Sequence, residues 1–258
     1  MYTYKRPEED DLDLAADCIV YSATGKEVRF GDLYEGARTI VCFIRHYWCP
    51  SCQDYLASIM RVEPAQLRAL NLQLIIIGCG NWKMIDGYRK ALGGCEFPIY
   101  SDPSREVYRH FGITMSSMAA GPKPAYTKHG LTANTLISLK RNLAMPLKNP
   151  GDLNGLGGEF VLGPGKTECA YAHRMKTTRD HAELVDILKA IGMAAPKELQ
   201  VQAEPVRRAR SAEEIRIDQV QRRAESVRRR RAKAYKPGRV VVTVAENGHV
   251  KDSSSETL

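Results

Sequence analysis

Long apolar runs are missing from this chain of 258 residues. The longest, LQLIII at residues 72–77, is far shorter than the roughly 20 apolar residues that a membrane-spanning helix needs. The first residues, MYTYKRPEEDDLDL, are acidic and have no apolar core, unlike a signal peptide or a transit peptide. We therefore expect no membrane span and a cytoplasmic location, with the nucleus as the second choice.

Cysteine is too sparse and too irregularly spaced for a disulfide framework. The chain has seven cysteines and no export signal, which is typical of a reducing compartment. There is one C-x-x-C pair, Cys49 and Cys52, whereas a structural zinc site needs four ligands at short spacings. His173 and His181 are too far apart in the sequence to complete such a site. We therefore expect no bound metal or cofactor.

Net positive charge is small in most of the chain and concentrated in one segment. The net charge is +8, and residues 197–239 hold 14 Lys and Arg against 6 Asp and Glu. Ser211 followed by Glu214 is a capping-box pattern, so a solvated basic helix is expected over residues 212–234. Nuclear import or contact with a partner protein are alternatives. Nucleic-acid binding is less favoured, because aromatic side chains that could stack on bases do not interleave with the basic ones.

Strand and helix patterns alternate between residues 18 and 192. This alternation, closed by a hairpin, predicts an α/β fold: a three-layer sandwich around a mixed β-sheet. Residues 114–156 are expected to form a long loop with one helical patch at ANTLISLKRNL. The expected strands are CIVYS, GKEVRF, RTIVCFIRH, LQLIIIGCG, EFPIYSD and the hairpin GEFVLGPGKTECAYAHR. One helix is expected to begin at Pro50, and Pro64 either kinks it or restarts it. Further helices are expected in NWKMIDGYRKALGG, PSREVYRHFG and DHAELVDILKAIG, the last with Asp180 as N-cap and Gly192 as C-cap.

Composition divides the chain into four parts. An acidic arm is expected at residues 1–14, followed by the α/β domain at residues 15–195. A linker and the basic helix occupy residues 196–239, and a disordered tail is expected at residues 240–258.

The pair Cys49-Pro50-Ser51-Cys52 lies where a strand turns into a helix. Free backbone N–H groups and the helix dipole at such a position stabilise a thiolate. Lowering a thiol pKa from about 8.5 to about 7 needs roughly 2 kcal/mol, and the dipole usually supplies about 0.3–1 kcal/mol. Arg45 and His46 are the candidates to supply the rest. The alternative is two thiols that lie close together by chance in the core.

Roles follow from the order of the two cysteines. Cys49 is expected to be the more exposed sulfur and the nucleophile, and Cys52 to resolve the intermediate to an intramolecular disulfide. Trp48 is either an aromatic wall beside the pair or simple packing. Cys79 follows a predicted strand at the active edge of the sheet, as either an extra thiol or a small buried residue. A catalytic role for His173 or His181, which flank the last predicted turn, is not favoured.

Five segments in order resemble the peroxiredoxin-like, AhpC/TSA antioxidant-type branch of the thioredoxin superfamily. They are GKEVRFGDLYEG, IVCFIRHYWCPSC, LIIIGCG, IYSDPSREVYRHFG and GGEFVLGPGKTECAYAHR, within about residues 15–193. The resemblance implies a thioredoxin-like fold and thiol-dependent redox chemistry. It extends to a C-x-x-C subgroup related to prostamide/prostaglandin F synthase, which reduces an endoperoxide.

The chain also departs from that family pattern. Aligned on Cys52, the peroxiredoxin pattern P-x-x-x-T-x-x-C has Arg45 in place of proline and Cys49 in place of threonine. Gly157 stands where the family has an arginine, and the pair Gly157-Gly158 replaces the cis-proline of thioredoxin. These departures do not favour fast reduction of hydrogen peroxide; they favour dithiol chemistry.

The sequence therefore predicts a thiol-dependent oxidoreductase that reduces a peroxide, an endoperoxide or a disulfide. A thioredoxin- or glutathione-type reductant, supplied ultimately by NADPH, would regenerate the dithiol. The alternative from another class is a redox-inert or redox-sensing interaction protein whose basic helix contacts a partner.

Overall fold

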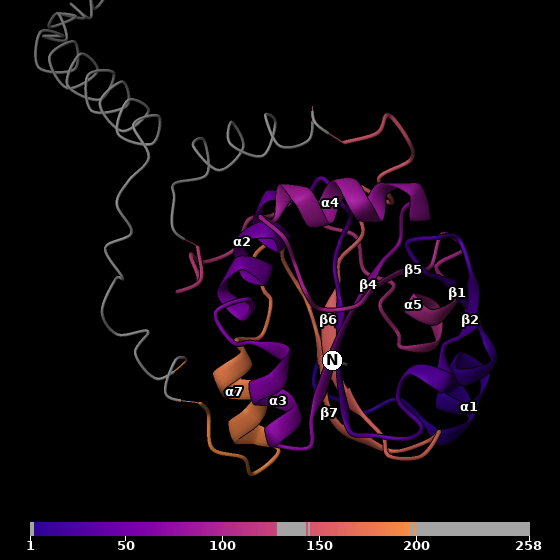
Figure 1. Ribbon diagram of the computed structural model, residues 1–258, viewed down its shortest axis with the longest axis vertical. Helices are drawn as coiled ribbons and strands as arrows, with labels where there is room; N and C mark the ends of the chain where they lie inside the picture. Colours follow the sequence, from indigo (N-terminus) through magenta and orange to yellow (C-terminus); the bar gives the residue numbers. More distant parts are fainter. Residues whose placement is uncertain (1–2, 128–142, 144, 197–198, 200–258) are drawn as a thin grey trace, which may run out of the picture. The chain divides into compact units, whose positions relative to one another are not determined.

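A seven-stranded mixed sheet forms the centre of the protein (Figure 1). The structure, a computed structural model, describes residues 3–127, 143, 145–196 and 199. The strand order is β2-β1-β5-β4-β3-β6-β7, with β3 parallel to β4 and antiparallel to β6. The strands are β1 (Ile19–Tyr21), β2 (Glu27–Arg29), β3 (Thr39–Phe43), β4 (Gln73–Gly78), β5 (Ile99–Ser101), β6 (Gly158–Leu162) and β7 (Cys169–Arg174).

The central strand β3 is buried along its whole length. Its β-branched and aromatic residues suit a strand that is covered on both faces. The antiparallel register pairs Cys42 of β3 with Glu159 of β6. Opposed residues project from the same face of a sheet, so a carboxylate enters the apolar face that also carries the cysteine pair.

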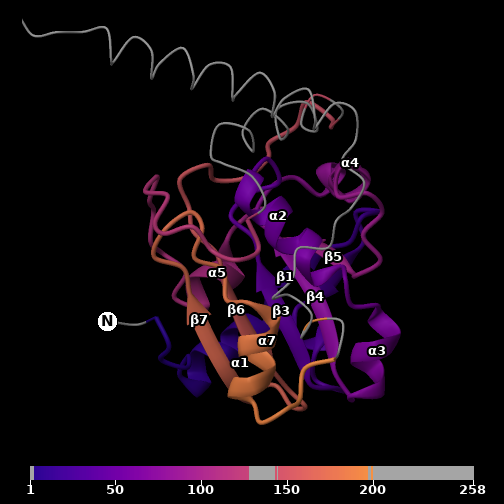
Figure 2. The same ribbon diagram turned by 90° about the vertical axis from the view of Figure 1, so that its left-hand side faces the viewer.

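Helices cover both faces of the sheet, which makes the three predicted layers (Figures 1 and 2). One buried cluster joins β3 and β4 to residues of four helices, and a second cluster joins the other face to two helices. The four on the first face are α2 (Pro50–Ile59), α3 (Pro64–Ala69), α4 (Ile85–Ala91) and α7 (Leu184–Ala190). The two on the second are α1 (Glu9–Asp17) and α5 (Glu106–His110). Of the two short 3-10 helices, Gly31–Leu33 packs against the second cluster and Trp82–Met84 against the first.

Prolines and strand patterns identified the elements well, and one predicted cap is wrong. Pro50 begins α2 as predicted, Pro64 begins a separate helix, α3, and the hairpin is β6–β7. The last helix begins later than expected, with Glu183 as its N-cap. Asp180 instead accepts a hydrogen bond from the Lys176 amide at 2.8 Å, which fixes a turn before the helix. Gly192 follows the helix with φ +75°, a conformation that suits glycine.

The ends of the domain differ from the compositional boundaries. The boundary expected at residue 14 falls inside α1, whose Leu12, Ala15 and Ala16 are buried. Leu199 is 2% exposed and joins the first core cluster. The predicted helix at residues 212–234, the tail, and nearly all of the helical patch at 133–143 lie outside the described residues. Among the helices that are described, none is long and apolar enough to cross a membrane.

Candidate active site

The two cysteines lie at the amino end of α2, as predicted. Cys49 is the N-cap, and Pro50 occupies the first helical position. Cys52 is in the first turn, and its amide donates to the Cys49 sulfur at 3.3 Å. The chain turns from β3 into a helix here because proline has a fixed φ that suits the first turn and lacks only an N–H that has no helical partner.

The expected exposure of Cys49 is wrong. Cys49 and Cys52 are both 0% exposed and belong to the first core cluster. Along the chain, half-buried Trp48 and Pro50 flank Cys49. The first turn of a helix is often exposed, but this one is packed inside a domain whose covering segments lie far away in sequence. A reagent can therefore reach either sulfur only after neighbouring groups move.

Cys49 has the surroundings of a thiolate. Burial opposes its ionisation, but a hydrogen bond from the Cys52 thiol and the electrostatic interactions with His46 and Arg45 together outweigh burial, so the pKa of Cys49 lies well below its usual value. The Arg45 Nη1 atom is 3.5 Å from the Cys49 sulfur. The helix dipole favours the thiolate as well.

Cys52 has the opposite surroundings. Burial and the neighbouring Cys49 thiolate raise the pKa of Cys52 well above its usual value. The Arg45 amide donates to the Cys52 sulfur at 3.5 Å. The pair therefore holds one negative charge, on Cys49, and one proton, on Cys52.

A buried carboxylate and two histidines lie behind Cys52. The Nε2 atom of His181 is 3.2 Å from the Cys52 sulfur, and its Nδ1 atom is 2.5 Å from Glu159 Oε1. His173 Nδ1 and the Ala182 amide reach Glu159 Oε2 at 2.8 Å and 3.0 Å. Burial by itself would raise the pKa of Glu159, but the two histidines bring it down to about 2.

The sequence prediction missed this group of residues. β6, β7 and the turn before α7 bring Glu159, His173 and His181 together, although 22 positions separate the first from the last. One signal was available: a glutamate in the otherwise apolar run GGEFVL. A charged residue buried in a strand requires partners, and two histidines follow within the same hairpin and turn.

Arg45 joins the pair to a loop more than one hundred residues further along the chain. Its Nε atom donates to the Gly155 carbonyl at 3.0 Å and its Nη2 atom to the Leu153 carbonyl at 2.8 Å. The same guanidinium contacts Cys49. Arg45 is 5% exposed, so these carbonyls and the sulfur are its main partners in place of water.

The other predicted support residues are His46, Trp48 and Cys79. Burial lowers the pKa of His46, and its Nδ1 atom is buried without a hydrogen-bond partner among the described residues. Trp48 packs half-buried against the cluster that contains both cysteines. The Cys79 thiol donates to the Arg45 carbonyl at 3.1 Å, and burial raises the pKa of Cys79 to about 11. Cys79 therefore supports the Arg45 backbone as a protonated thiol.

Close packing explains the glycine pair that replaces the family's arginine and the cis-proline of thioredoxin. A Cβ atom on Gly157 would overlap the carbonyl oxygen of Phe43, and one on Gly158 would overlap that of His173. β3, β6 and β7 therefore approach too closely for any side chain at these positions.

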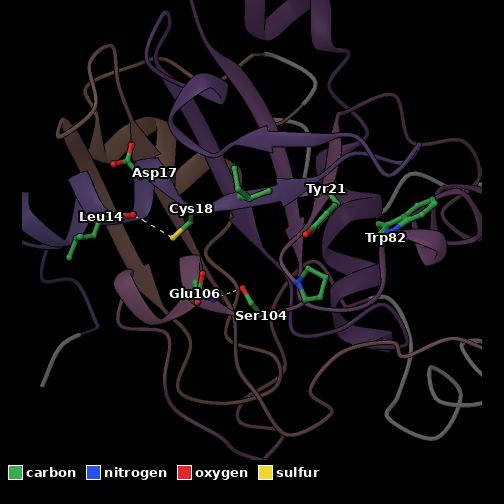
Figure 3. A pocket seen from close by; sticks show the side chains of 9 residues that line it. Leu14, Asp17, Cys18, Tyr21, Trp82, Ser104 and Glu106 are labelled. Carbon is green, nitrogen blue, oxygen red and sulfur yellow. Dashed lines mark hydrogen bonds between the residues drawn. The ribbon is translucent and has the colours of Figure 1, made fainter.

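A surface pocket of about 660 Å³ lies outside this site (Figure 3). The side chains that line it include Cys18, Tyr21 and Trp82. The Cys18 thiol donates a hydrogen bond to the Leu14 carbonyl at 3.4 Å. None of the residues that line it belongs to the cysteine pair or its partners. In the described part of the chain, no group of three or more histidine, cysteine, aspartate or glutamate side chains could hold a metal ion.

Comparisons with known proteins point to one family. Residues 60–177 match the model of the AhpC/TSA antioxidant enzyme family, a range that begins after the cysteine pair. The mouse (Mus musculus) protein peroxiredoxin-like 2C is 32% identical over 181 residues, which cover 69% of this chain and 79% of that protein. Its human (Homo sapiens) counterpart is also 32% identical, over 180 residues with the same shares.

A more distant relative carries the name of an enzyme. The zebrafish (Danio rerio) prostamide/prostaglandin F synthase is 25% identical over 185 residues, or 70% of this chain and 88% of that protein. Identity above 30% over more than two thirds of both chains shows common membership, together with the mixed sheet and the cysteine pair at a helix start. The chain therefore belongs to the AhpC/TSA peroxiredoxin-like family of thioredoxin-fold thiol oxidoreductases.

Proposed function

We propose that this protein is a dithiol oxidoreductase in which Cys49 attacks a peroxide, an endoperoxide or a disulfide and Cys52 resolves the intermediate. The observation that carries the proposal is the unequal state of the two sulfurs. Cys49 has a pKa well below its usual value and Cys52 one well above. A nucleophile that ionises easily beside a protonated partner is the arrangement that thiol–disulfide chemistry requires.

The reaction with a peroxide has two balanced steps. The Cys49 thiolate attacks one oxygen, so that an S–O bond forms and the O–O bond breaks. The leaving oxygen takes a proton from water. Cys52 then attacks the Cys49 sulfur, an S–S bond forms, and water leaves. The substrate gains two electrons, and the dithiol becomes a disulfide.

Two observations bear on the substrate class. Arg45 and Cys49 occupy the positions of the proline and threonine of the peroxiredoxin pattern, which argues against hydrogen peroxide as the preferred substrate. The name of the zebrafish relative supports an endoperoxide. Regeneration then requires an external dithiol or thiol, of the thioredoxin or glutathione type. The reaction needs no bound cofactor.

Mass spectrometry after mild treatment with organic hydroperoxide tests the proposal. Loss of two hydrogens from the peptide that contains residues 49–52 is expected, with reversal by a thioredoxin-type reductant. Cys49→Ser and Cys52→Ser should each abolish the loss. A peptide unchanged after treatment, in protein whose fold is intact, contradicts the proposal.

The second candidate is a redox-inert interaction protein, and the full burial of both sulfurs favours it. In that case peroxide treatment leaves the pair reduced, and the basic segment over residues 212–234 carries the function. A screen of hydroperoxides, endoperoxides and protein disulfides, coupled to thioredoxin regeneration, separates the two candidates. The cytoplasmic or nuclear location is part of the proposal and is tested by imaging the tagged full chain.

A further inference from the structure

A chain of hydrogen bonds leads from a buried carboxylate to the resolving sulfur. Glu159, His181 and Cys52 are 0% to 5% exposed. The His181 ring stacks on Tyr55 with ring centroids 4.3 Å apart, and its amide donates to the Tyr126 hydroxyl at 3.2 Å. The imidazole therefore has one fixed orientation, with Nδ1 on the carboxylate and Nε2 on the sulfur.

The carboxylate determines which nitrogen of His181 is basic. Glu159 is ionised at neutral pH, since its pKa is held at about 2. An ionised carboxylate only accepts hydrogen bonds, so His173, His181 and the Ala182 amide must all donate to it. In neutral His181 the proton is then on Nδ1, and the lone pair of Nε2 faces the Cys52 sulfur.

The proposed reaction needs a base at this position. Cys52 must lose its proton before it can attack, yet burial and the neighbouring charge hold that proton on the sulfur. While Cys49 is a thiolate, it accepts the Cys52 hydrogen bond. After Cys49 is oxidised this anion is gone, and the Nε2 lone pair at 3.2 Å is the acceptor that remains in contact.

We propose that His181 is the catalytic base of the resolving step, and that Glu159 is the residue that positions it. This inference depends on the proposed function, because it assigns the base for the second step of that reaction. The Cys52 S–H bond breaks as Nε2 takes the proton, and the electron pair left on Cys52 forms the S–S bond. The Cys49 sulfenic oxygen, or the second half of an external disulfide, leaves with its electron pair. Glu159 stabilises the imidazolium that forms.

A two-phase experiment with 5,5′-dithiobis(2-nitrobenzoic acid), used below the protein concentration, separates the steps. The Cys49 thiolate attacks the reagent and releases one coloured thiolate, and Cys52 then releases the second. In His181→Asn the first phase should stay within about threefold, while the second slows by roughly 100-fold or more, the usual contribution of a general base. Asparagine keeps a donor for Glu159 but presents no base to the sulfur. His181→Gln is the second variant.

The pH profile distinguishes a base from a merely structural residue. In the full-length wild-type protein the second phase should depend less steeply on pH than in His181→Asn, because an internal base and not hydroxide takes the proton. In His181→Asn it should rise in proportion to hydroxide throughout. Glu159, Cys52, Tyr55 and Tyr126 are the titratable groups that face the imidazole, and wild type and variant share all four. A structural role would lower the rate equally at every pH.

His110 provides the matched control. It lies in α5, where it faces Asp11 at 3.9 Å, and His110→Asn should leave both phases unchanged. An equally fast second phase in wild type and in folded His181→Asn overturns this inference and leaves the proposed function intact. If wild type shows no first phase and no oxidation by hydroperoxide, the proposed function itself fails.

Discussion

At the scale of single residues, the two cysteines differ in charge because different groups face them. Arg45 and His46 face Cys49, while His181 faces Cys52. The pKa values of two cysteines less than one helical turn apart are therefore shifted in opposite directions. This difference favours Cys49 as the nucleophile. The sequence predicted the same role for Cys49, but from its expected exposure and not from its ionisation.

Alkylation should follow ionisation and not exposure. Burial raises the pKa of half-exposed Cys18 to about 11, so on the order of one Cys18 in 10⁴ is ionised at pH 7. Cys49 should react with iodoacetamide before Cys18 unless opening of the site costs more than about 5 kcal/mol. It should also react before Cys52. Peptide mass spectrometry over time gives the order, and earlier labelling of Cys52 would reverse the assigned roles.

Acid should destabilise the protein through Glu159. Its folded pKa is about 2, below the usual 4.5, so this carboxylate stabilises the fold fully above pH 4.5 and loses the contribution as pH falls towards 2. The loss is on the order of 3 kcal/mol. Urea unfolding at several pH values should show this decline. Glu159→Gln should be less stable at pH 7 and should lack this part of the decline.

The C-x-x-C pair and Arg45 could be found from sequence, because their relation is local. The Glu159 group could not be placed that way, since its geometry depends on the register of β3 with β6 and on the turn before α7. The burial of Cys49 could not be predicted from the sequence either. Exposure of a helix start depends on which distant segments pack over it, and no periodicity within residues 44–60 reports that.

At the scale of elements, β6 has two tasks. It pairs with the central strand β3, and it places Glu159 behind α2. The sequence predicted the hairpin correctly from its turn residues and apolar runs. It did not explain Gly157 and Gly158, because a close backbone approach leaves no local pattern.

Gly157→Ala should destabilise the domain. The added Cβ would overlap the backbone of β3 at Phe43, and a backbone cannot move aside as a flexible side chain can. We expect a loss at the upper end of the roughly 1–3 kcal/mol typical of overpacking. Gly36→Ala is the matched control, since a Cβ there meets no atom within 4 Å. Thermal unfolding of both variants decides, and equal melting temperatures would contradict the prediction.

At the scale of the whole molecule, one domain carries all the chemistry assigned above. The sequence predicted its fold from the alternation of strands and helices, and set its end near residue 195. The structure adds Leu199 to the core. A single apolar side chain beyond a proline-containing stretch is below what composition can detect.

The stability of a truncated chain should therefore depend on whether it retains Leu199. A chain that ends at residue 206 should unfold at the same denaturant concentration as the full chain. One that ends at residue 196 loses Leu199 and should be less stable by about 1.5–3 kcal/mol, the value of a fully buried leucine. Both chains should still form the 49–52 disulfide. Equal stability of the two would place the domain boundary before Leu199.

The contacts of Arg45 depend on the charge of the Cys49 sulfur. Its guanidinium holds the carbonyls of Leu153 and Gly155 while it faces the Cys49 sulfur. When that sulfur changes from anion to neutral disulfide in the proposed reaction, the arginine loses its counter-charge and keeps only the two neutral carbonyls as partners. In the proposed reaction, oxidation of the buried pair therefore changes the contacts that hold the backbone of Leu153 and Gly155.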